Sequence, residues 1–371
     1  MSALVTRAAV LREFGAAQRV EEVRLRAPGR GEALVRITAA GVCHSDVGQA
    51  DGEWEFPLPA VLGHEGAGVV EQIGPGATTA RGTRVLLSLA PGCGRCLHCL
   101  QGRPILCQDS LDAMGEGRLT TGPSPISVDG EAVSAYSLLA CFAGHAVVAE
   151  RSLIPLPDDV PDEVGALVGC AVITGVGAAF ESIDVPAGSR GAVIGAGGVG
   201  VNAIQGARAR GAAAVLAIDS SAERLEWARR FGATEMLSAG DQQVIGSLRG
   251  DAAREGLDWT IVTVGDTGAM TLGVELLRPS GTAAIVGLAP QGRTAPINML
   301  DLVTYERRVV GSAYGTLSPR LLVPRILDLY RSGALRLEEL VGDRFALEEI
   351  NQAFDAARSA RGLRSVVRLD D

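Results

Sequence analysis

The chain has 371 residues, 47% of them hydrophobic, which is enough to bury more than one typical core, so two domains are expected. Its formal net charge of -9 argues against a nucleic-acid partner and against a polybasic membrane patch. The sequence contains no lysine, because every basic side chain is an arginine. That excludes a Schiff-base lysine, a P-loop lysine and a tyrosine–lysine pair as the source of proton chemistry.

Nothing in the N-terminal region resembles a targeting segment. Residues 1–14 carry charge throughout and lack an apolar stretch of signal-peptide length. The most apolar stretch, residues 164–180, is rich in glycine and alanine, which favours a packed interior over a membrane span. We therefore expect a cytoplasmic protein, no membrane partner, and seven cysteines that are thiols or metal ligands rather than disulfides.

The order of the predicted elements indicates two different architectures. Short β-type runs broken by turns, at 33–39, 68–73 and 84–89, predict an antiparallel, partly barrel-like domain in the first third. From about residue 172, apolar strands alternate with helices, which is typical of a parallel sheet. The predicted order is strand 191–194, helix 198–210, strand 214–218, helix 222–231, then strands 259–264, 282–286 and 308–312. The last segment, 319–371, predicts two helices and a terminal strand at 365–369.

A glycine-rich turn joins the strand 191–194 to the helix that follows it. Its sequence, Gly195-Ala196-Gly197-Gly198-Val199-Gly200, is the G-x-G-x-x-G of dinucleotide sites. The helix N-terminus presents free N–H groups to a pyrophosphate. Asp219 ends the next strand, where it can bind ribose hydroxyls and repel a 2′-phosphate, which favours NAD over NADP. A plain glycine-rich turn with a solvated Asp219 is the alternative, and Arg224 is either near the ribose or simply exposed.

Four cysteines lie within 15 residues: Cys93, Cys96, Cys99 and Cys107. Four thiolates satisfy a tetrahedral zinc ion and leave no open position, so the predicted site is structural. An iron–sulfur cluster or a redox disulfide pair are the competing interpretations of this spacing. A zinc knuckle for nucleic acid is disfavoured by the acidic chain.

A second metal site can be assembled from residues that are far apart in the sequence. Cys43, His64 and Cys170 would offer two sulfurs and one imidazole nitrogen. Three protein ligands with an open fourth position are typical of catalytic zinc, which polarises a carbonyl and lowers the pKa of a bound alcohol. Single buried cysteines are also common in cores, so spacing alone leaves that interpretation open. His98 is interpreted as a surface residue, and Cys141 and His145 as structural residues.

Taken together, the motifs resemble the zinc-containing medium-chain alcohol dehydrogenases. The matching segments are Gly-Val-Cys-His-Ser-Asp at 41–46, Gly-His-Glu-Gly-Ala-Gly at 63–68, the four-cysteine loop, Gly-Cys at 169–170 with Thr-Gly at 174–175, and the glycine-rich turn at 195–200. The resemblance runs from Gly41 to Arg364. It implies an enzyme that transfers hydride between a primary or secondary alcohol, or the matching aldehyde or ketone, and NAD. It also implies two zinc ions per chain.

The resemblance assigns a role to individual positions. Cys43, His64 and Cys170 would hold the catalytic zinc, with Glu65 close enough to exchange with water in its shell. Asp46 would orient the histidine ligand, and Ser45 would take the alcohol proton. The implied coenzyme contacts are His44, Thr174, Gly195, Gly197, Gly198, Val199, Gly200, Asp219, Arg224, Val286 and Arg364, with His44 and Arg364 on the pyrophosphate side.

One departure from the family concerns the proton path. Many relatives have a histidine three residues after the Ser45 position, where this chain has Gly48. The path must then end in water or in another side chain. The matching substrate-pocket positions are Trp54, Leu89 and Tyr136. The large rings of Trp54 and Tyr136 would suit an aromatic or extended substrate or would merely narrow the pocket.

The expected fold is α/β. A mostly β, GroES-like catalytic domain takes residues 1–171 and 314–371, and a doubly wound Rossmann domain takes 172–313, with the active site between them. A homodimer or homotetramer, associated near residues 308–314, is implied by the resemblance. A formaldehyde dehydrogenase linked to glutathione or mycothiol is a close rival, and a non-catalytic NAD-binding sensor is a rival from another class.

Overall fold

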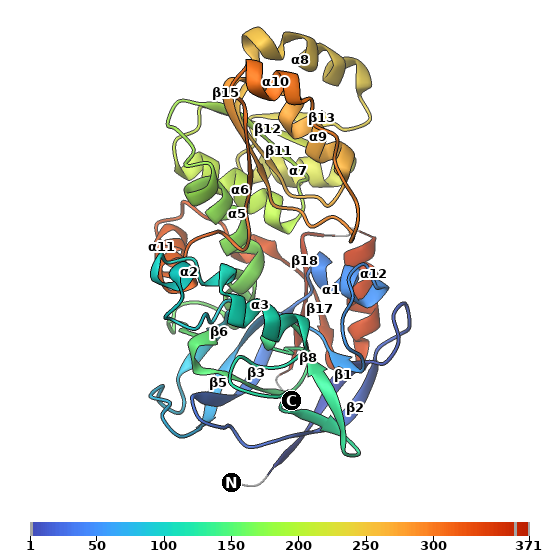
Figure 1. Ribbon diagram of the computed structural model, residues 1–371, viewed down its shortest axis with the longest axis vertical. Helices are drawn as coiled ribbons and strands as arrows, with labels where there is room; N and C mark the ends of the chain where they lie inside the picture. The colour runs from blue at the N-terminus through green and yellow to red at the C-terminus, as the bar shows by residue number, and fades with distance from the viewer. Residues whose placement is uncertain (1–2, 360–361, 370–371) are drawn as a thin grey trace. The chain divides into compact units, whose positions relative to one another are not determined.

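The computed structural model describes residues 3–359 and 362–369, which form two compact units. Unit 1 comprises Met1–Cys170, Ser318–Val323 and Leu337–Asp371, and unit 2 comprises Ala171–Leu317 and Pro324–Arg336. Each unit has its own sheets and its own buried apolar core, which is what a separately packed domain requires (Figure 1).

Unit 1 is built from a closed barrel and an open sheet. The barrel order is β1 (Leu4–Leu11), β2 (Arg19–Leu25), β7 (Ile126–Val128), β8 (Glu131–Ala135) and β4 (Ala60–Val61). The sheet order is β10 (Leu153–Pro155), β6 (Arg84–Leu87), β5 (Glu65–Ile73), β3 (Glu32–Gly41), β18 (Arg364–Arg368) and β17 (Val341–Ala346), with β9 (His145–Ala149) also paired to β3. The predicted barrel-like, largely antiparallel architecture is therefore confirmed, whereas β17 was missed from the sequence.

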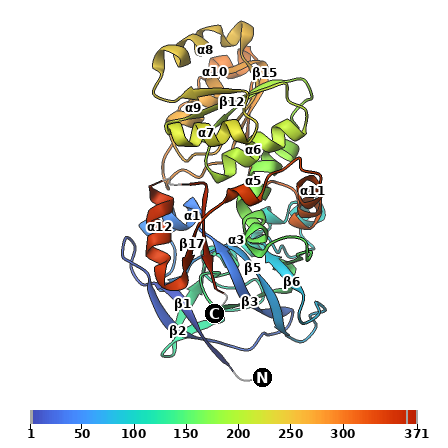
Figure 2. The same cartoon turned by 180° about the vertical axis from the view of Figure 1, so that it is seen from behind.

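Unit 1 also contains short helices. They are α1 (His44–Asp51), α2 (Leu97–Leu100), α3 (Gln108–Gly115), α4 (Asp162–Leu167) and α12 (Ile350–Arg358), with 3-10 turns at Pro104–Leu106, Tyr136–Leu138, Glu150–Ser152, Glu338–Leu340 and Leu347–Glu349. Helix α12 packs against β17 and β18 on the side seen in Figure 2. Helix α1 follows β3 almost directly and ends at Gly52 in the left-handed conformation, so it projects from the end of the most buried strand.

Unit 2 is a parallel sheet of six strands with helices between them. The order is β13 (Glu235–Ser238), β12 (Ala214–Asp219), β11 (Arg190–Ile194), β14 (Leu257–Val262), β15 (Leu277–Ile285) and β16 (Arg308–Gly311). The helices are α5 (Ile173–Gly177), α6 (Gly198–Ala209), α7 (Ala222–Arg230), α8 (Gln242–Glu255), α9 (Thr267–Glu275) and α10 (Met299–Thr304), together with α11 (Pro319–Arg331) from Pro324 onwards. The strand order reverses beside β11, which is the switch point where dinucleotides bind in such sheets.

A long apolar helical run joins α4 to α5 through the π-helical turn Val168–Val172 and ends in a second one, Ala178–Ser182. By length and composition the run Asp162–Ser182 could cross a membrane, but 83% of its apolar window is buried in the protein. It is therefore a core helix, as its glycine and alanine content predicts.

The return of the chain to unit 1 differs from the expected boundary at residue 314. Residues 314–317 and 324–336 belong to unit 2. The reason is local bonding: Arg336 N donates to Gln205 Oε1 at 2.7 Å, and Arg325 Nη1 lies 3.2 Å from Glu181 Oε1. The pattern of apolar residues in the sequence does not reveal such polar tertiary contacts, so it could not predict this domain boundary.

Candidate metal centres and coenzyme site

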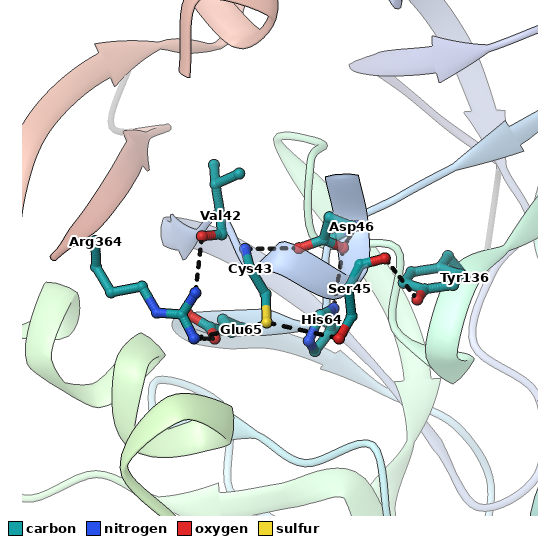
Figure 3. A network of polar contacts seen from close by, with 9 residues as sticks. Val42, Cys43, Ser45, Asp46, His64, Glu65, Tyr136 and Arg364 are labelled. Carbon is teal, nitrogen blue, oxygen red and sulfur yellow. Dashed lines mark hydrogen bonds and ion pairs between the residues drawn. The ribbon is translucent and has the colours of Figure 1, made fainter. Parts of the chain in front are cut away.

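The dispersed Cys/His/Glu set meets at one buried point. The ligand atoms of Cys43, His64, Glu65 and Cys170 all lie within 4.8 Å of one another, and all four residues are buried. Cys43 precedes α1, His64 and Glu65 stand where β5 begins, and Cys170 lies in the π-helical turn Val168–Val172. The chain therefore brings together residues separated by more than a hundred positions, as the resemblance implied. Figure 3 shows three of them, Cys43, His64 and Glu65.

Asp46 fixes the orientation of the imidazole. Its Oδ1 lies 2.9 Å from His64 Nδ1 and also accepts from Gly63 N at 3.1 Å, while Oδ2 accepts from Cys43 N at 3.0 Å. Burial by itself lowers the pKa of His64, but the Asp46 charge and hydrogen bond outweigh it and raise the pKa well above its usual value. With Nδ1 held by the carboxylate, Nε2 is left for a metal.

Glu65 is a buried carboxylate whose oxygens accept no hydrogen bond from the described residues. Arg364 Nη2 lies 3.2 Å from Glu65 Oε1, but burial dominates and raises the pKa of Glu65 to about 8. A buried carboxylate that accepts no hydrogen bond, beside two thiols and an imidazole, is what a bound cation would satisfy.

Arg364 reaches the thiol of Cys43 as well as Glu65. It donates to Val42 O at 3.2 Å and to Cys43 Sγ at 3.6 Å (Figure 3). A hydrogen bond from Cys170, together with Arg364 and His64, lowers the pKa of Cys43 well below its usual value in spite of burial. The donor set of two sulfurs and one nitrogen, with one thiol inclined to ionise, fits zinc. The coenzyme role implied for Arg364 stays a prediction, since its guanidinium contacts Val42, Cys43 and Glu65.

Ser45 and Tyr136 lie beside this cluster. Ser45 Oγ is 3.8 Å from Cys43 Sγ, and the Tyr136 hydroxyl donates to Ser45 O at 3.3 Å. The Tyr136 ring meets the His64 ring at 5.8 Å and 73°, and the Phe56 ring at 5.5 Å and 86°. The sequence analysis did not single out Phe56, and no motif could have identified it.

The space beside Gly48 is filled by other side chains. A Cβ at Gly48 would lie 2.7 Å from Glu53 Oε2 and 2.7 Å from the Trp54 ring. A histidine at position 48 would displace Trp54. In this chain the Trp54 ring and the Glu53 side chain therefore occupy the space that the histidine of many relatives would need. Leu89, the third predicted pocket residue, packs against the same core cluster as Tyr136.

The four-cysteine loop also forms a cluster. The sulfurs of Cys93, Cys96, Cys99 and Cys107 lie within 4.8 Å of one another. Backbone N–H groups point at them: Cys93 N donates to Cys107 Sγ and Cys96 N to Cys93 Sγ, both at 3.3 Å. Hydrogen bonds from the backbone N–H groups of Arg95 and Cys96 lower the pKa of Cys93 to about 6. These bonds favour the thiolate form of Cys93, whereas burial raises the pKa of Cys99 to about 12.

The glycine-rich turn of unit 2 has the geometry that a pyrophosphate needs. Gly195 takes a φ of +92°, and a side chain at Gly200 would collide with the Gly195 carbonyl oxygen, so neither position accepts a larger residue. Helix α6 starts at Gly198, with Gly197 as its N-cap. Thr263 Oγ1 donates to Gly195 O at 2.8 Å and fastens the turn to the end of β14.

Asp219 holds the same turn from the end of β12. Its Oδ2 accepts from Ala196 N at 2.7 Å and its Oδ1 from Ser221 N at 2.8 Å. Arg224 stands over Gly197, with its Cζ 3.9 Å from where a Cβ would be, and its buried Nε has no hydrogen-bond partner among the described residues. The other predicted coenzyme positions are spread out: His44 is exposed at the start of α1, Thr174 lies on α5, Val199 on α6, and Val286 follows β15.

A GroES-like unit with a buried three-ligand metal cluster and a four-thiol cluster, together with a dinucleotide sheet, defines a metal-dependent dehydrogenase. Two family models match: an alcohol dehydrogenase GroES-like domain over residues 29–158 and a zinc-binding dehydrogenase over residues 198–330. A putative alcohol dehydrogenase D of Mycobacterium tuberculosis is 36% identical over 98% of this chain and 99% of its own length.

Solved structures agree with these matches. Benzyl alcohol dehydrogenase from Acinetobacter calcoaceticus is similar with a TM-score of 0.92 and 31% identity, covering 98% of this chain and 99% of its own. Acetophenone reductase from Geotrichum candidum in complex with NAD is similar with a TM-score of 0.80 and 26% identity, covering 99% and 98%. The chain belongs to the zinc-containing medium-chain alcohol dehydrogenase family. It is an enzyme, a zinc-dependent oxidoreductase.

Proposed function

We propose that this enzyme transfers hydride between NAD and a primary or secondary alcohol, or the matching aldehyde or ketone. The main observation behind the proposal is that four buried residues bring their ligand atoms within 4.8 Å of one another. They are Cys43, His64, Glu65 and Cys170. Cys43, His64 and Cys170 would hold the catalytic zinc, and the four-cysteine loop the structural one. Zinc in such a site supplies a Lewis acid that lowers the pKa of an alcohol towards neutrality.

The residues around the cluster position the substrate and handle its proton. Asp46 fixes the tautomer and direction of His64, so the donor set is organised before substrate arrives. Ser45, 3.8 Å from the Cys43 sulfur, accepts the proton of the alcohol through its hydroxyl. Gly48 offers no side chain for the next step, so the proton leaves from Ser45 to water or to a different side chain.

A substrate panel tests the activity. The wild-type enzyme is mixed with NAD and a series of alcohols, or with NADH and aldehydes and ketones, and the change in NADH absorbance is recorded. Benzyl alcohol belongs at the head of the panel because a similar structure is a benzyl alcohol dehydrogenase. Turnover only in the presence of glutathione or mycothiol would assign the thiol-linked formaldehyde reaction instead. NAD binding without any turnover would support the sensor.

The choice of NAD over NADP rests on Asp219. Its carboxylate accepts from the amides of Ala196 and Ser221 beside the glycine-rich turn, which supports a role in which it would bind ribose hydroxyls and repel a 2′-phosphate. The acetophenone reductase that resembles this chain carries NAD. In Asp219→Gly, the ratio of kcat/KM for NADP to that for NAD should rise by about tenfold or more, which corresponds to roughly 1.4 kcal/mol.

A second variant separates the effect of the Asp219 charge from the effect of its hydrogen bonds to the amides of Ala196 and Ser221. Asp219→Asn keeps an oxygen that can accept from one amide but removes the charge, so its coenzyme ratio should shift in the same direction. Initial rates over a range of coenzyme concentrations measure both ratios. An unchanged ratio in both variants would remove Asp219 from the proposed ribose site.

We also propose that the protein is a cytoplasmic homo-oligomer, associated through the edge of the unit 2 sheet. Strand β16 ends that sheet, and nearby α10 exposes Met299, Leu300 and Val303 by 63%, 74% and 73%. An open strand edge beside exposed apolar side chains favours pairing with a second copy. Light scattering should give a dimer or tetramer for the wild type and a smaller particle for Val303→Asp; a monomeric wild type would contradict this assignment.

A further inference from the structure

Three non-glycine residues within four positions adopt the left-handed backbone conformation directly after Tyr136. The φ angles of Ser137, Leu138 and Ala140 are +50°, +67° and +55°. This conformation brings Cβ against the following carbonyl oxygen, and it is a true outlier for a bulky residue such as Leu138. Within the described part of unit 1, the other such residue is Asp129, in the exposed turn between β7 and β8. The run of three is therefore a local concentration of backbone strain.

Hydrogen bonds at both ends of this run maintain it. Leu139 N and Ala140 N both donate to Tyr136 O, at 3.0 and 3.1 Å, which coils the backbone tightly behind the tyrosine. The next residue, Cys141, donates to Gly63 O at 2.9 Å. Since Gly63 directly precedes His64, the strained run connects the backbone of Tyr136 to the backbone of a metal-centre residue.

The side chain of Tyr136 lies against the same centre. Its hydroxyl donates to Ser45 O, in the first turn of α1, at 3.3 Å. Its ring packs edge-on to His64 at 5.8 Å (Figure 3). Phe56 packs edge-on against the Tyr136 ring at 5.5 Å. Asp46 binds the imidazole through Nδ1, so any tilt of the ring is a pivot about that atom. A second ring packed edge-on against the imidazole restricts the pivot.

We propose that Tyr136 is a positioning residue of the catalytic centre, and that the left-handed run at 137–140 holds it in place. The ring sets the tilt of His64, and the hydroxyl holds the turn of α1 that carries Ser45. Strain that persists in a buried segment needs compensating contacts, and here those contacts include the bonds to Gly63 O and Ser45 O and the ring contact with His64. The proposal rests on the proposed function in one respect, since the alcohol reaction is what the positioned groups would serve.

Four variants of the zinc-loaded enzyme test the proposal. Tyr136→Phe removes the bond to Ser45 O and keeps the ring, whereas Tyr136→Leu removes the ring. Ala140→Gly releases the strained run, and Asp129→Gly is the matched control, because it makes the same left-handed-to-glycine change in the exposed turn between β7 and β8. Two measurements are made on each variant: the rate at which zinc is lost to a chelator, followed by elemental analysis, and kcat and KM for an alcohol substrate.

Tyr136→Leu should accelerate the loss of one zinc by about tenfold and lower kcat by about ten- to a hundredfold, the range found when groups that orient metal ligands are removed. Ala140→Gly should change both quantities in the same direction by at least about threefold, as expected for a freed backbone. Tyr136→Phe should lower kcat at an unchanged rate of zinc loss, and Asp129→Gly should change neither quantity.

A merely structural role for Tyr136 would lower the thermal midpoint without changing zinc loss in any variant, and that result would overturn the proposal. Equal effects of Ala140→Gly and Asp129→Gly would overturn it too. If Tyr136→Leu does not fold, Tyr136→Phe and Ala140→Gly decide. Because zinc loss is measured without substrate, absence of alcohol turnover in the wild type would refute the proposed function and leave the test of Tyr136 intact.

Discussion

Replacing Cys43 by alanine should abolish alcohol turnover while the protein stays folded. The change removes one of the two sulfurs in the four-residue cluster and the sulfur that Arg364 contacts at 3.6 Å. Loss of a metal ligand removes the Lewis acid from the reaction, so kcat/KM should fall by about a thousandfold or more. The metal content should fall from two zinc ions per chain to one.

The Cys43→Ala variant should still fold, because the backbone of residue 43, which the substitution keeps, makes the hydrogen bond that begins α1. Cys43 N donates to Asp46 Oδ2, which starts α1 regardless of the side chain at this position. The thermal midpoint should therefore stay within about 5 °C of the wild type. Circular dichroism on heating and elemental analysis measure the two quantities on the same sample.

Cys141→Ala is the matched control. Cys141 is a second buried thiol, it belongs to neither metal cluster of the described residues, and burial raises its pKa well above the usual value, which keeps the thiol neutral. This variant should lose some stability, because its sulfur packs against Gly66, but keep two zinc ions and its activity. Unchanged NAD-linked activity in Cys43→Ala would refute the assigned role of the cluster.

The two metal sites were predictable from the sequence to different degrees. The four cysteines lie within 15 residues, so their spacing alone indicates that their sulfurs can meet around one ion. Cys43, His64 and Cys170 come from three separate segments, and their spacing in the sequence does not indicate how far apart they lie in the folded protein. Only the order of several motifs, compared with a family, predicted that they meet. The structure then brings their ligand atoms within 4.8 Å.

Other features of the structure could not be predicted from the sequence, because they depend on contacts between distant parts of the chain. Ser137-Leu138-Leu139-Ala140 contains no glycine or asparagine that would announce a left-handed backbone. Arg364 meets Cys43 across 321 positions, because β18 pairs with β3 beside α1. The alternation of strands and helices in unit 2 was predictable, since it depends on local periodicity, whereas the place of residues 324–336 depends on contacts such as that between Arg336 and Gln205.

Replacing Cys107 by serine should destabilise the protein more than any change at the catalytic centre. Cys107 is fully buried, whereas the other three cysteines of its cluster are partly exposed. Its sulfur accepts from Cys93 N, and its carbonyl oxygen accepts from Ser110 N and Leu111 N, so it joins the metal loop to the start of α3. Structural zinc sites contribute folding free energy on the order of 10 kcal/mol. Zinc content should fall to one ion, and the thermal midpoint should fall by about 10 °C or more.

His98→Ala is the control within the same loop. His98 is exposed between two of the cysteines, so its loss should leave two zinc ions and an unchanged thermal midpoint. Limited proteolysis adds a local measurement: the loop between Cys93 and Cys107 should be cut early in Cys107→Ser and remain protected in His98→Ala. Two zinc ions and full stability in Cys107→Ser would show that the cluster is not a structural zinc site.

The two cysteine variants together separate the roles of the two metals. Cys43→Ala and Cys107→Ser should each retain one zinc ion, but the first should be stable and inactive, and the second unstable. The double variant should hold no zinc, because the two clusters share no ligand. Its loss of stability should equal that of Cys107→Ser within about 0.5 kcal/mol, as expected for independent sites. A larger loss would mean that the catalytic cluster also supports the fold, and iron in place of zinc in Cys43→Ala would identify the four-cysteine site as an iron–sulfur centre.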